Sequence, residues 1–482
     1  MFFKIVVLLF LVISTEIYSF VPFNKYNVVK NRSVSSKQAK KTKPIFSPIS
    51  EEILIKENDN KINLNIDDDA LYKILLGIQV FPALTFLDIT SELNDLSIRK
   101  IIGYLYFLST ASLSVYLGSK RQDIPIKFRN KPITQKSALL APFLSGGVLL
   151  SIYAVIKYLS SFELIFEKGY QLLAVILSVF CMDTVLSDVV YKEVDENGIP
   201  LPQEEPNSSQ LGLTIGTFIG LSYLLFNYLP VPDLGLVNDI EKYYAIAPLN
   251  NLCAIGIAIL SIGQVQIESF TVAALLLGGL FFYDIFFVFG VDVMVTVATK
   301  IEAPVKLLVP ASTEKILSRP YPFSVLGLGD LVVPGIMVGL ARGIDRQKEI
   351  IAAELLNLQN KNKKTGNEVT SFFSTLSFLN KKGKNNVFNS SDVDNGNSSG
   401  STKGQIEEGK ISYLSSALTG YIFGLFCAFT ANEVTKAGQP ALLYLSPSVT
   451  LSMLYAAYIN GEIAELLNGT LETSAKRKEE TD

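Results

Sequence analysis

The sequence contains no histidine in its 482 residues. This absence excludes a Ser-His or Cys-His catalytic triad, a HExxH zinc site and a histidine-ligated haem. Cysteine is scarce as well, since only Cys181, Cys253 and Cys427 are present, each in a separate apolar segment. They have neither the spacing of metal ligands nor the density of a disulfide scaffold, so we predict a structural role for them. We expect no metal and no cofactor.

Charge is also low. Charged residues make up 18% of the chain, apolar residues make up 49%, and the mean hydropathy is +0.34. Long apolar runs in a chain of this composition predict a polytopic membrane protein whose surroundings are a lipid bilayer. The net charge of -3 suggests no polyanionic partner, and we therefore expect no nucleic acid to bind.

Nine apolar stretches are long enough to cross about 30 Å of hydrocarbon as helices of roughly 20 residues. They lie at 100–118, 137–158, 169–190, 210–229, 243–262, 269–290, 323–341, 413–433 and 439–460. The sequence therefore predicts an all-α bundle of about nine transmembrane helices. The stretch 71–90 is apolar too, but Lys73, Pro82 and Asp88 interrupt it, and it is either a further span or an interfacial helix.

The segments between and around the spans complete the predicted organisation. In chain order, the segments are a signal peptide at 1–20, a basic presequence or disordered linker at 21–70, the extra apolar segment and a connector at 71–97, helices 1 to 5 at 98–262, helices 6 and 7 at 263–345, a disordered cytosolic insertion at 346–410, helices 8 and 9 at 411–465 and a tail at 466–482.

Lysine and arginine collect in three places: the loop after the first span, the loop after the seventh span and the C-terminal tail. With nine spans, all three fall on the same side of the membrane, which the positive-inside rule makes cytosolic. The start of the first span and both ends of the loop between spans six and seven are then expected on the lumenal side.

Two acidic residues lie inside apolar spans, Asp284 in the sixth and Asp330 in the seventh. An ionised side chain in a bilayer costs several kcal/mol and is normally retained for a function. If the sixth span ends near Gly290 and the seventh begins at Phe323, the two acids lie about 9 Å and about 10 Å from the lumenal ends of their helices. Because consecutive spans are antiparallel, we expect the two carboxylates to face each other.

Two carboxylates a few ångströms apart in a medium of low dielectric constant share one proton. In aspartyl proteolysis the ionised carboxylate takes a proton from a water, which attacks the peptide carbonyl, while the protonated carboxyl group hydrogen-bonds the carbonyl oxygen. Gly327 and Gly329 remove side chains where a substrate backbone would approach Asp330. A membrane-embedded acid pair also suits an ion or proton relay, so a transporter or channel is the alternative. A scaffold that binds membrane helices without cutting them is a third possibility.

The last span begins with Gln439, Pro440, Ala441 and Leu442. Proline lacks an amide hydrogen and keeps the preceding residue out of helix, which makes the backbone irregular here. Irregular backbone at membrane depth is tolerated only beside protein or water. Its free groups are available to pair with an extended substrate by strand addition, which would unwind a substrate helix.

Several motifs, taken together and in this order, resemble those of signal peptide peptidase, the presenilin-type family of intramembrane aspartyl proteases. They are FYDIFFVFG at 282–290, VMVTVA at 293–298, EAPVKL at 302–307, LGLGD at 326–330 and QPALLY at 439–444. The resemblance implies that Asp284 and Asp330 are the catalytic pair. It places in the substrate-binding site Tyr283, Gly327, Leu328, Gly329, Gln439, Pro440, Ala441 and Leu442.

The resemblance further implies nine spans with a lumenal N-terminus and a cytosolic C-terminus. The implied reaction is cleavage, within the bilayer, of type II-oriented transmembrane helices such as signal peptides left after signal peptidase. The family implies the endoplasmic reticulum or another endomembrane, whereas a signal followed by a basic stretch resembles a presequence for a secondary plastid membrane. The oligomeric state is left open, a homo-oligomer included.

Overall fold

The structure is a computed structural model of the chain. It describes residues 27–28, 68–79, 81, 96–123, 132–158, 160–190, 193–194, 210–228, 239–291, 293, 297, 303–310, 323–364, 411–435 and 439–469. Internal contacts divide the chain into two units, Met1–Asp345 with Ile411–Asp482, and Arg346–Lys410. The predicted signal peptide, most of the presequence, the insertion beyond Lys364 and the tail beyond Gly469 lie outside the described residues.

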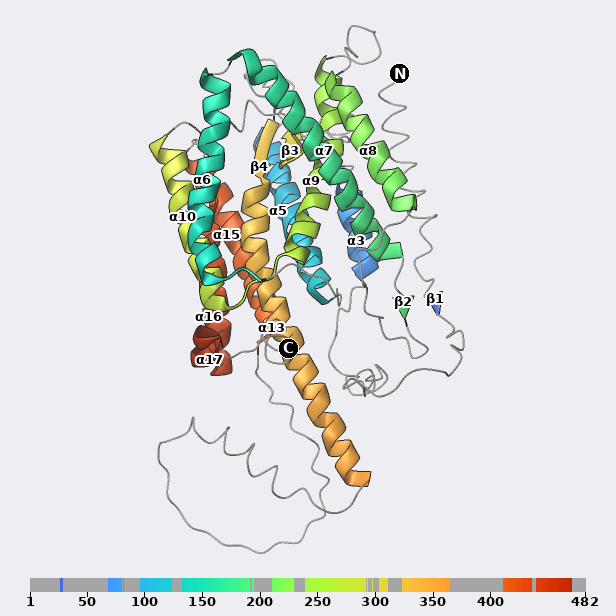
Figure 1. Ribbon diagram of the computed structural model, residues 1–482, viewed down its shortest axis with the longest axis vertical. Coiled ribbons are helices and arrows are strands. Elements are labelled where there is room, and N and C mark those ends of the chain that lie inside the picture. Colours follow the sequence, from blue (N-terminus) through green and yellow to red (C-terminus); the bar gives the residue numbers. More distant parts are fainter. Residues whose placement is uncertain are drawn as a thin grey trace, which may run out of the picture. The chain divides into compact units, whose positions relative to one another are not determined.

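Among the described residues, eight helices of the first unit are long and apolar enough to cross a membrane. They are α5 (Leu96–Lys120), α6 (Gln135–Tyr158), α7 (Ser160–Val190), α8 (Gln210–Tyr228), α9 (Asp239–Gln264), α10 (Phe270–Ile285) with the π-helical turn η3 (Phe286–Gly290), α15 (Tyr413–Thr435) and α16 (Leu442–Asn460). These helices, drawn in Figure 1, coincide with eight of the nine predicted spans and confirm a polytopic helical membrane protein. The count of nine is not confirmed.

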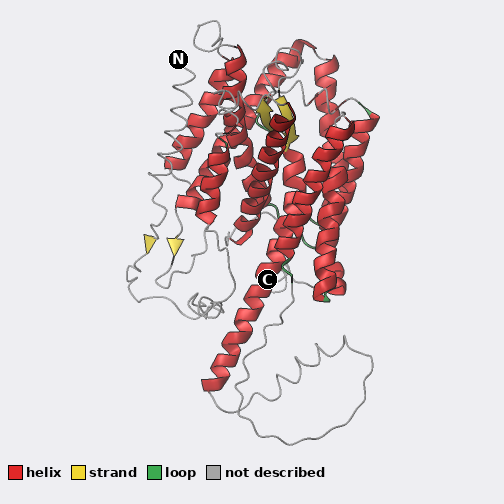
Figure 2. Ribbon diagram, turned by 180° about the vertical axis from the view of Figure 1, so that it is seen from behind, coloured by secondary structure: helices red, strands yellow, loops and turns green. Residues whose placement is uncertain are grey.

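The difference lies at the seventh predicted span, 323–341. Residues Phe323–Gly327 form a strand, β4, which pairs antiparallel with β3 (Lys306–Pro310), and a helix, α13 (Leu328–Lys364), begins only after it. Figure 2 shows this hairpin in yellow among the red helices. The expectation of a span that is helical from Phe323 was therefore wrong, because a short apolar run has the same hydropathy as strand or as helix. The uncharged part of α13, between Asp330 and Arg342, is also shorter than a full span.

The same helix changes the prediction for the following segment. Residues 346–364 were expected to belong to a disordered insertion, but α13 continues through them to Lys364. They contain many good helix formers, among them Glu, Leu, Lys, Gln and Ala, and the helix is already nucleated by the preceding turns. The prediction of disorder is therefore wrong for this part of the insertion.

Several elements are too short to span a membrane. They are α3 (Asp68–Ile78), the 3-10 turn η2 (Arg121–Asp123), α17 (Ile463–Asn468) and the parallel pair β1 (Asn27–Val28) with β2 (Glu193–Val194). Helix α3 lies within the extra apolar segment, and its 11 residues extend about 16 Å. It packs against α5, and both Leu75 and Gln79, which follows the helix, are buried. The described helix is therefore packed against the bundle and is too short to span the membrane.

Helix α9 lies at the centre of the bundle. It packs against α5, α7, α8 and β3, and 89% of its most apolar stretch is buried inside the bundle. Helices α15 and α16 pack so closely that a Cβ atom on Gly424 would lie only 3.0 Å from both the Leu445 Cα and the Tyr444 carbonyl oxygen. Helix α16 also contacts α10, so the start of the last span is fixed between two other spans.

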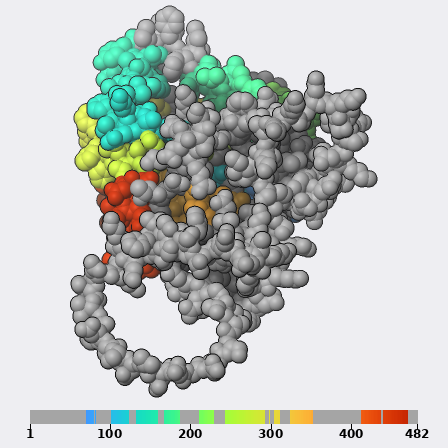
Figure 3. All heavy atoms as spheres, turned by 60° about the horizontal axis from the view of Figure 1, so that its bottom comes forward, coloured from blue at the N-terminus to red at the C-terminus, as the bar shows by residue number. Residues whose placement is uncertain are grey.

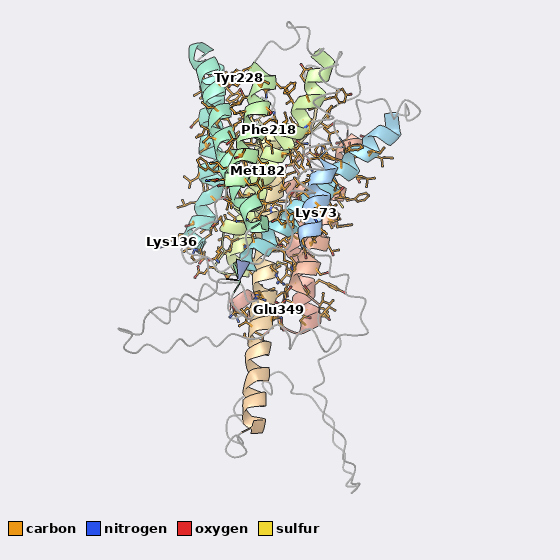
Figure 4. The ribbon with its side chains drawn as sticks, turned by 90° about the vertical axis from the view of Figure 1, so that its right-hand side faces the viewer. Lys73, Lys136, Met182, Phe218, Tyr228 and Glu349 are labelled. Carbon is orange, nitrogen blue, oxygen red and sulfur yellow. The ribbon has the colours of Figure 1, made fainter. Side chains whose placement is uncertain are left out.

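The outward faces of the spans are apolar. On α6, Phe143 is 78% exposed, and on α10 Phe282 is 71% exposed. These two helices pack side by side on the face seen in Figure 3. On α8, Phe218 projects outward, whereas Met182 of α7 is buried against Gly256 of α9 (Figure 4). Exposed apolar side chains along whole helices are expected where lipid, not water, is the solvent.

Candidate active site

Asp284 is the only charged residue of α10. The helix begins after Ser269, whose hydroxyl accepts a hydrogen bond from the Val272 amide at 3.4 Å. Asp284 lies in its last turn with 2% of its surface exposed, and the π-helical turn follows directly. Such turns occur frequently at functional sites. The acid is thus buried in an apolar helix beside a local change in helical geometry.

The start of α16 is fixed against this acid. The Leu442 amide donates a hydrogen bond of 3.1 Å to Asp284 Oδ2. Leu442 is the first residue of α16, so its amide is one of the four that have no acceptor within the helix. A carboxylate at the positive end of a helix is favoured, and it here completes a helix start that Pro440 and Ala441 leave without a side-chain cap. The Pro-Ala-Leu segment therefore lies at Asp284.

Asp330 reaches the same place from the β3–β4 hairpin. The ladder continues one residue beyond β4, because the Leu328 amide donates to the Val305 carbonyl oxygen at 3.1 Å. Asp330 follows in the first turn of α13 and is partly exposed. A Cβ atom on Gly327 would lie 3.3 Å from Asp330 Oδ2, so a side chain there would crowd the carboxylate. A Cβ atom on Gly329 would meet nothing within 4 Å.

The two carboxylates lie close enough to interact electrostatically. Tyr421 of α15 lies within the same range of Asp330. It is fully buried, and its hydroxyl has no hydrogen-bond partner among the described residues. The arrangement combines two acids within electrostatic range of each other, a helix-start amide on Asp284 and a buried hydroxyl near Asp330. Such a set can hold a proton between the acids and polarise a bound carbonyl group.

The other predicted site residues have different surroundings. The Tyr283 ring packs on Phe287, with ring centroids 4.7 Å apart, and faces Gly146 of α6. The Gln439 amide donates to the Thr435 hydroxyl at 3.0 Å, which ties the end of α15 to the start of α16. Leu328 packs partly buried against the core. The structure thus brings Gly327 next to Asp330 and Leu442 next to Asp284, and Tyr283 lies within electrostatic range of Asp284, while Gln439 contacts the end of α15.

Sequence reasoning missed two contributors to the site. One is Tyr421, for which a tyrosine within an apolar span is too weak a signal. The other is the pair Asn250 and Asn251 of α9, whose side chains hydrogen-bond the backbone of β3. Two adjacent amides in the span 243–262 were a usable signal, since polar side chains within a membrane are costly unless they have partners.

Comparisons with known proteins identify the family of the chain. The model of the signal peptide peptidase family matches residues 126–473. A probable intramembrane protease of Schizosaccharomyces pombe is 28% identical over 379 residues, which are 78% of this chain and 95% of that protein. The signal peptide peptidases of Mus musculus and Homo sapiens are 26% and 25% identical, over 76% of this chain and 79% of theirs. Because the family model matches well over half of the chain, the chain belongs to the signal peptide peptidase family.

Proposed function

We propose that Asp284 and Asp330 are the catalytic pair of an aspartic-type endopeptidase that cleaves type II-oriented transmembrane helices, such as remnant signal peptides, within the bilayer. The chain is a multi-pass membrane protein and an intramembrane protease, as its family membership and its relatives indicate. The observation that supports the proposal is that two carboxylates, from α10 and α13, lie within electrostatic range of each other inside an apolar bundle. No comparison supports the transporter alternative.

The contacts of the two acids suggest different roles for them. The hydrogen bond from the Leu442 amide stabilises negative charge on Asp284, so we assign Asp284 as the base and Asp330 as the acid. Asp284 takes a proton from a water whose oxygen attacks the peptide carbonyl carbon, and Asp330 gives its proton to the carbonyl oxygen. The resulting gem-diol collapses when the C–N bond breaks. The nitrogen then takes the proton from Asp284, and Asp330 regains one from a hydroxyl group.

The hairpin offers a place for the substrate backbone. Because backbone groups alternate along an antiparallel pair, and Leu328 bonds to Val305, the backbone groups of Val325 and Gly327 point away from β3. No described strand pairs with β4 on the side of these Val325 and Gly327 groups, and Ser324 and Val325 are exposed. An extended segment that added to this edge would have its peptide bonds next to Asp330. Strand addition would replace the substrate's own helical hydrogen bonds.

The test is cleavage of a model type II transmembrane peptide by purified enzyme in detergent. Asp284→Asn and Asp330→Asn should each abolish cleavage while the protein still inserts and folds. Asp183→Asn is the matched control, because Asp183 is a buried acid on α7 outside the site. Substantial residual cleavage in either active-site variant would refute the dyad. Ion or proton flux into vesicles that contain the protein, without any peptide cleavage, would support the transporter alternative instead.

We further propose an endoplasmic reticulum or endomembrane location, with a secondary plastid membrane as the alternative. The basis for the first is the family, and for the second the signal followed by a basic stretch in residues 1–70. A fluorescent protein fused to residues 1–70 distinguishes them, since plastid labelling would contradict the first location and reticular labelling the second.

A further inference from the structure

One edge of β3 pairs with β4, and the other faces α9 (Figure 1). On that second edge, the Asn251 side chain donates to the Leu308 carbonyl oxygen at 2.8 Å and accepts from the Leu308 amide at 2.7 Å. The neighbouring Asn250 side chain donates to the Lys306 carbonyl oxygen at 2.6 Å. A side-chain amide has the same donor and acceptor as a peptide group. Asn251 therefore takes the place of a further strand.

These bonds are buried, and both polar atoms of the Asn251 side chain have partners, whereas Asn250 Oδ1 has none among the described residues. Asn250 and Asn251 are both 0% exposed. The Asn251 amide nitrogen also donates to the Tyr106 hydroxyl at 2.7 Å, and its oxygen is within 3.3 Å of the Asn250 amide nitrogen. Without Asn251, the amide and carbonyl groups of Leu308 would be left unpaired in an apolar bundle, where water cannot replace the lost partner.

The network extends beyond α9 to the first described helix. The Tyr106 hydroxyl of α5 donates to Gln79 Oε1 at 2.5 Å, and the Gln79 amide donates to the Leu75 carbonyl oxygen of α3 at 3.2 Å. Gln79 and Tyr106 are 0% and 4% exposed. A continuous buried chain of hydrogen bonds thus joins α3, α5, α9 and β3.

We propose that Asn251 is a positioning residue for proteolysis. Its side chain occupies the edge of β3 that faces α9, so only the edge of β4 that points away from β3 is open to substrate. This arrangement holds Asp330 in place beside the open edge. The inference rests on the proposed function of the two acids. Asn251 touches neither acid; it acts through β3, β4 and the junction of β4 with α13. Gln79 and Tyr106 orient its amide so that both Leu308 groups are bound.

The test combines kinetics with hydrogen–deuterium exchange on the purified full-length protein. Asn251→Leu replaces the amide with an apolar group of similar size. It should accelerate exchange in peptides covering 305–310 and lower kcat/KM for a model transmembrane peptide by about tenfold or more. Asn227→Leu is the matched control, because this amide donates to the Tyr223 carbonyl oxygen of its own helix at 2.9 Å. It should change neither measurement.

Unchanged exchange at 305–310 in Asn251→Leu would overturn the proposal, and so would faster exchange with wild-type kcat/KM. The exchange is repeated in an Asp330→Asn background, with and without the Asn251 substitution, because that comparison does not depend on catalysis. A failure of the proposed function shows instead as cleavage retained by Asp330→Asn alone.

If Asn251→Leu does not insert, Tyr106→Phe provides the test with a smaller change. It removes one hydroxyl of the network and leaves the Asn251 bonds to Leu308 in place. We expect intermediate exchange at 305–310 and a fall in kcat/KM of about two- to fivefold. Exchange and kinetics identical to wild type would refute the orienting role of Tyr106 and, with it, the proposed network.

Discussion

Gly424→Ala should impair catalysis without touching either acid. The added methyl group would lie 3.0 Å from the Leu445 Cα and from the Tyr444 carbonyl oxygen, both of which are backbone atoms at the start of α16. Non-bonded carbon atoms prefer at least about 3.5 Å, so α16 has to move by about 0.5 Å. A shift of that size distorts the 3.1 Å bond from the Leu442 amide to Asp284, because the strength of a hydrogen bond depends on its length and angle.

The expected loss follows from the strength of that bond. A hydrogen bond to a charged group contributes about 1.5–3 kcal/mol, which corresponds to a fall in kcat of about 10- to 150-fold when it acts on the base. The assay is steady-state cleavage of a model transmembrane peptide by purified enzyme in detergent, with thermal unfolding as the check on folding. The matched control is Gly278→Ala on α10, where an added Cβ atom meets nothing within 4 Å.

The control should retain wild-type kcat and gain up to about 1 kcal/mol of helix stability. Wild-type kcat in Gly424→Ala, with an unfolding temperature also like wild type, would refute the reasoning. That result would mean that α16 does not hold Asp284 through its first amide, and that the Pro-Ala-Leu segment contributes in another way.

Three further predictions concern single contacts, two at the site and one at the start of α15. Gly327→Ala should lower kcat by about tenfold with little change in KM, because its Cβ atom would lie 3.3 Å from Asp330 Oδ2; unchanged kcat would argue against this crowding. Tyr421→Phe removes a buried hydroxyl without a described hydrogen-bond partner, so thermal stability should be kept or raised while kcat falls; a drop in both would mean a structural role. Asp345→Ala should cost about 1–2 kcal/mol in unfolding, since its carboxylate caps α15 through the Ser412 hydroxyl and the Tyr413 and Leu414 amides; equal unfolding midpoints would contradict this.

Much of the bundle could be predicted from the sequence. A helix that crosses lipid must be apolar over about 20 residues, so hydropathy alone located eight spans. The acids could be identified because a charged residue in an apolar helix is conspicuous, as Asp284 is in α10. Both signals are local along the chain and need no knowledge of what packs against what.

The hairpin was not predictable in this way. The run from Phe323 to Gly327 is only five residues long, and its strand partner, Lys306–Pro310, lies at a distance along the chain. The strand Lys306–Pro310 has a second partner, Asn251, which lies more than fifty residues upstream of it. Strand formation here depends on these non-local hydrogen bonds, whereas hydropathy records only the preference for lipid.

The two acids, beside the π-helical turn and in the first turn of α13, differ in exposed surface among the described residues. Asp284 is 2% exposed, while Asp330 is partly exposed beside Gly329 and the open edge of β4. In the proposed reaction, the water would therefore arrive from the side of β4, which is also the side where the peptide would dock. Once an extended peptide lies along that edge, it blocks the route. The proposed reaction then predicts that the water binds before the peptide, and that the cleaved ends must leave before a new water can enter.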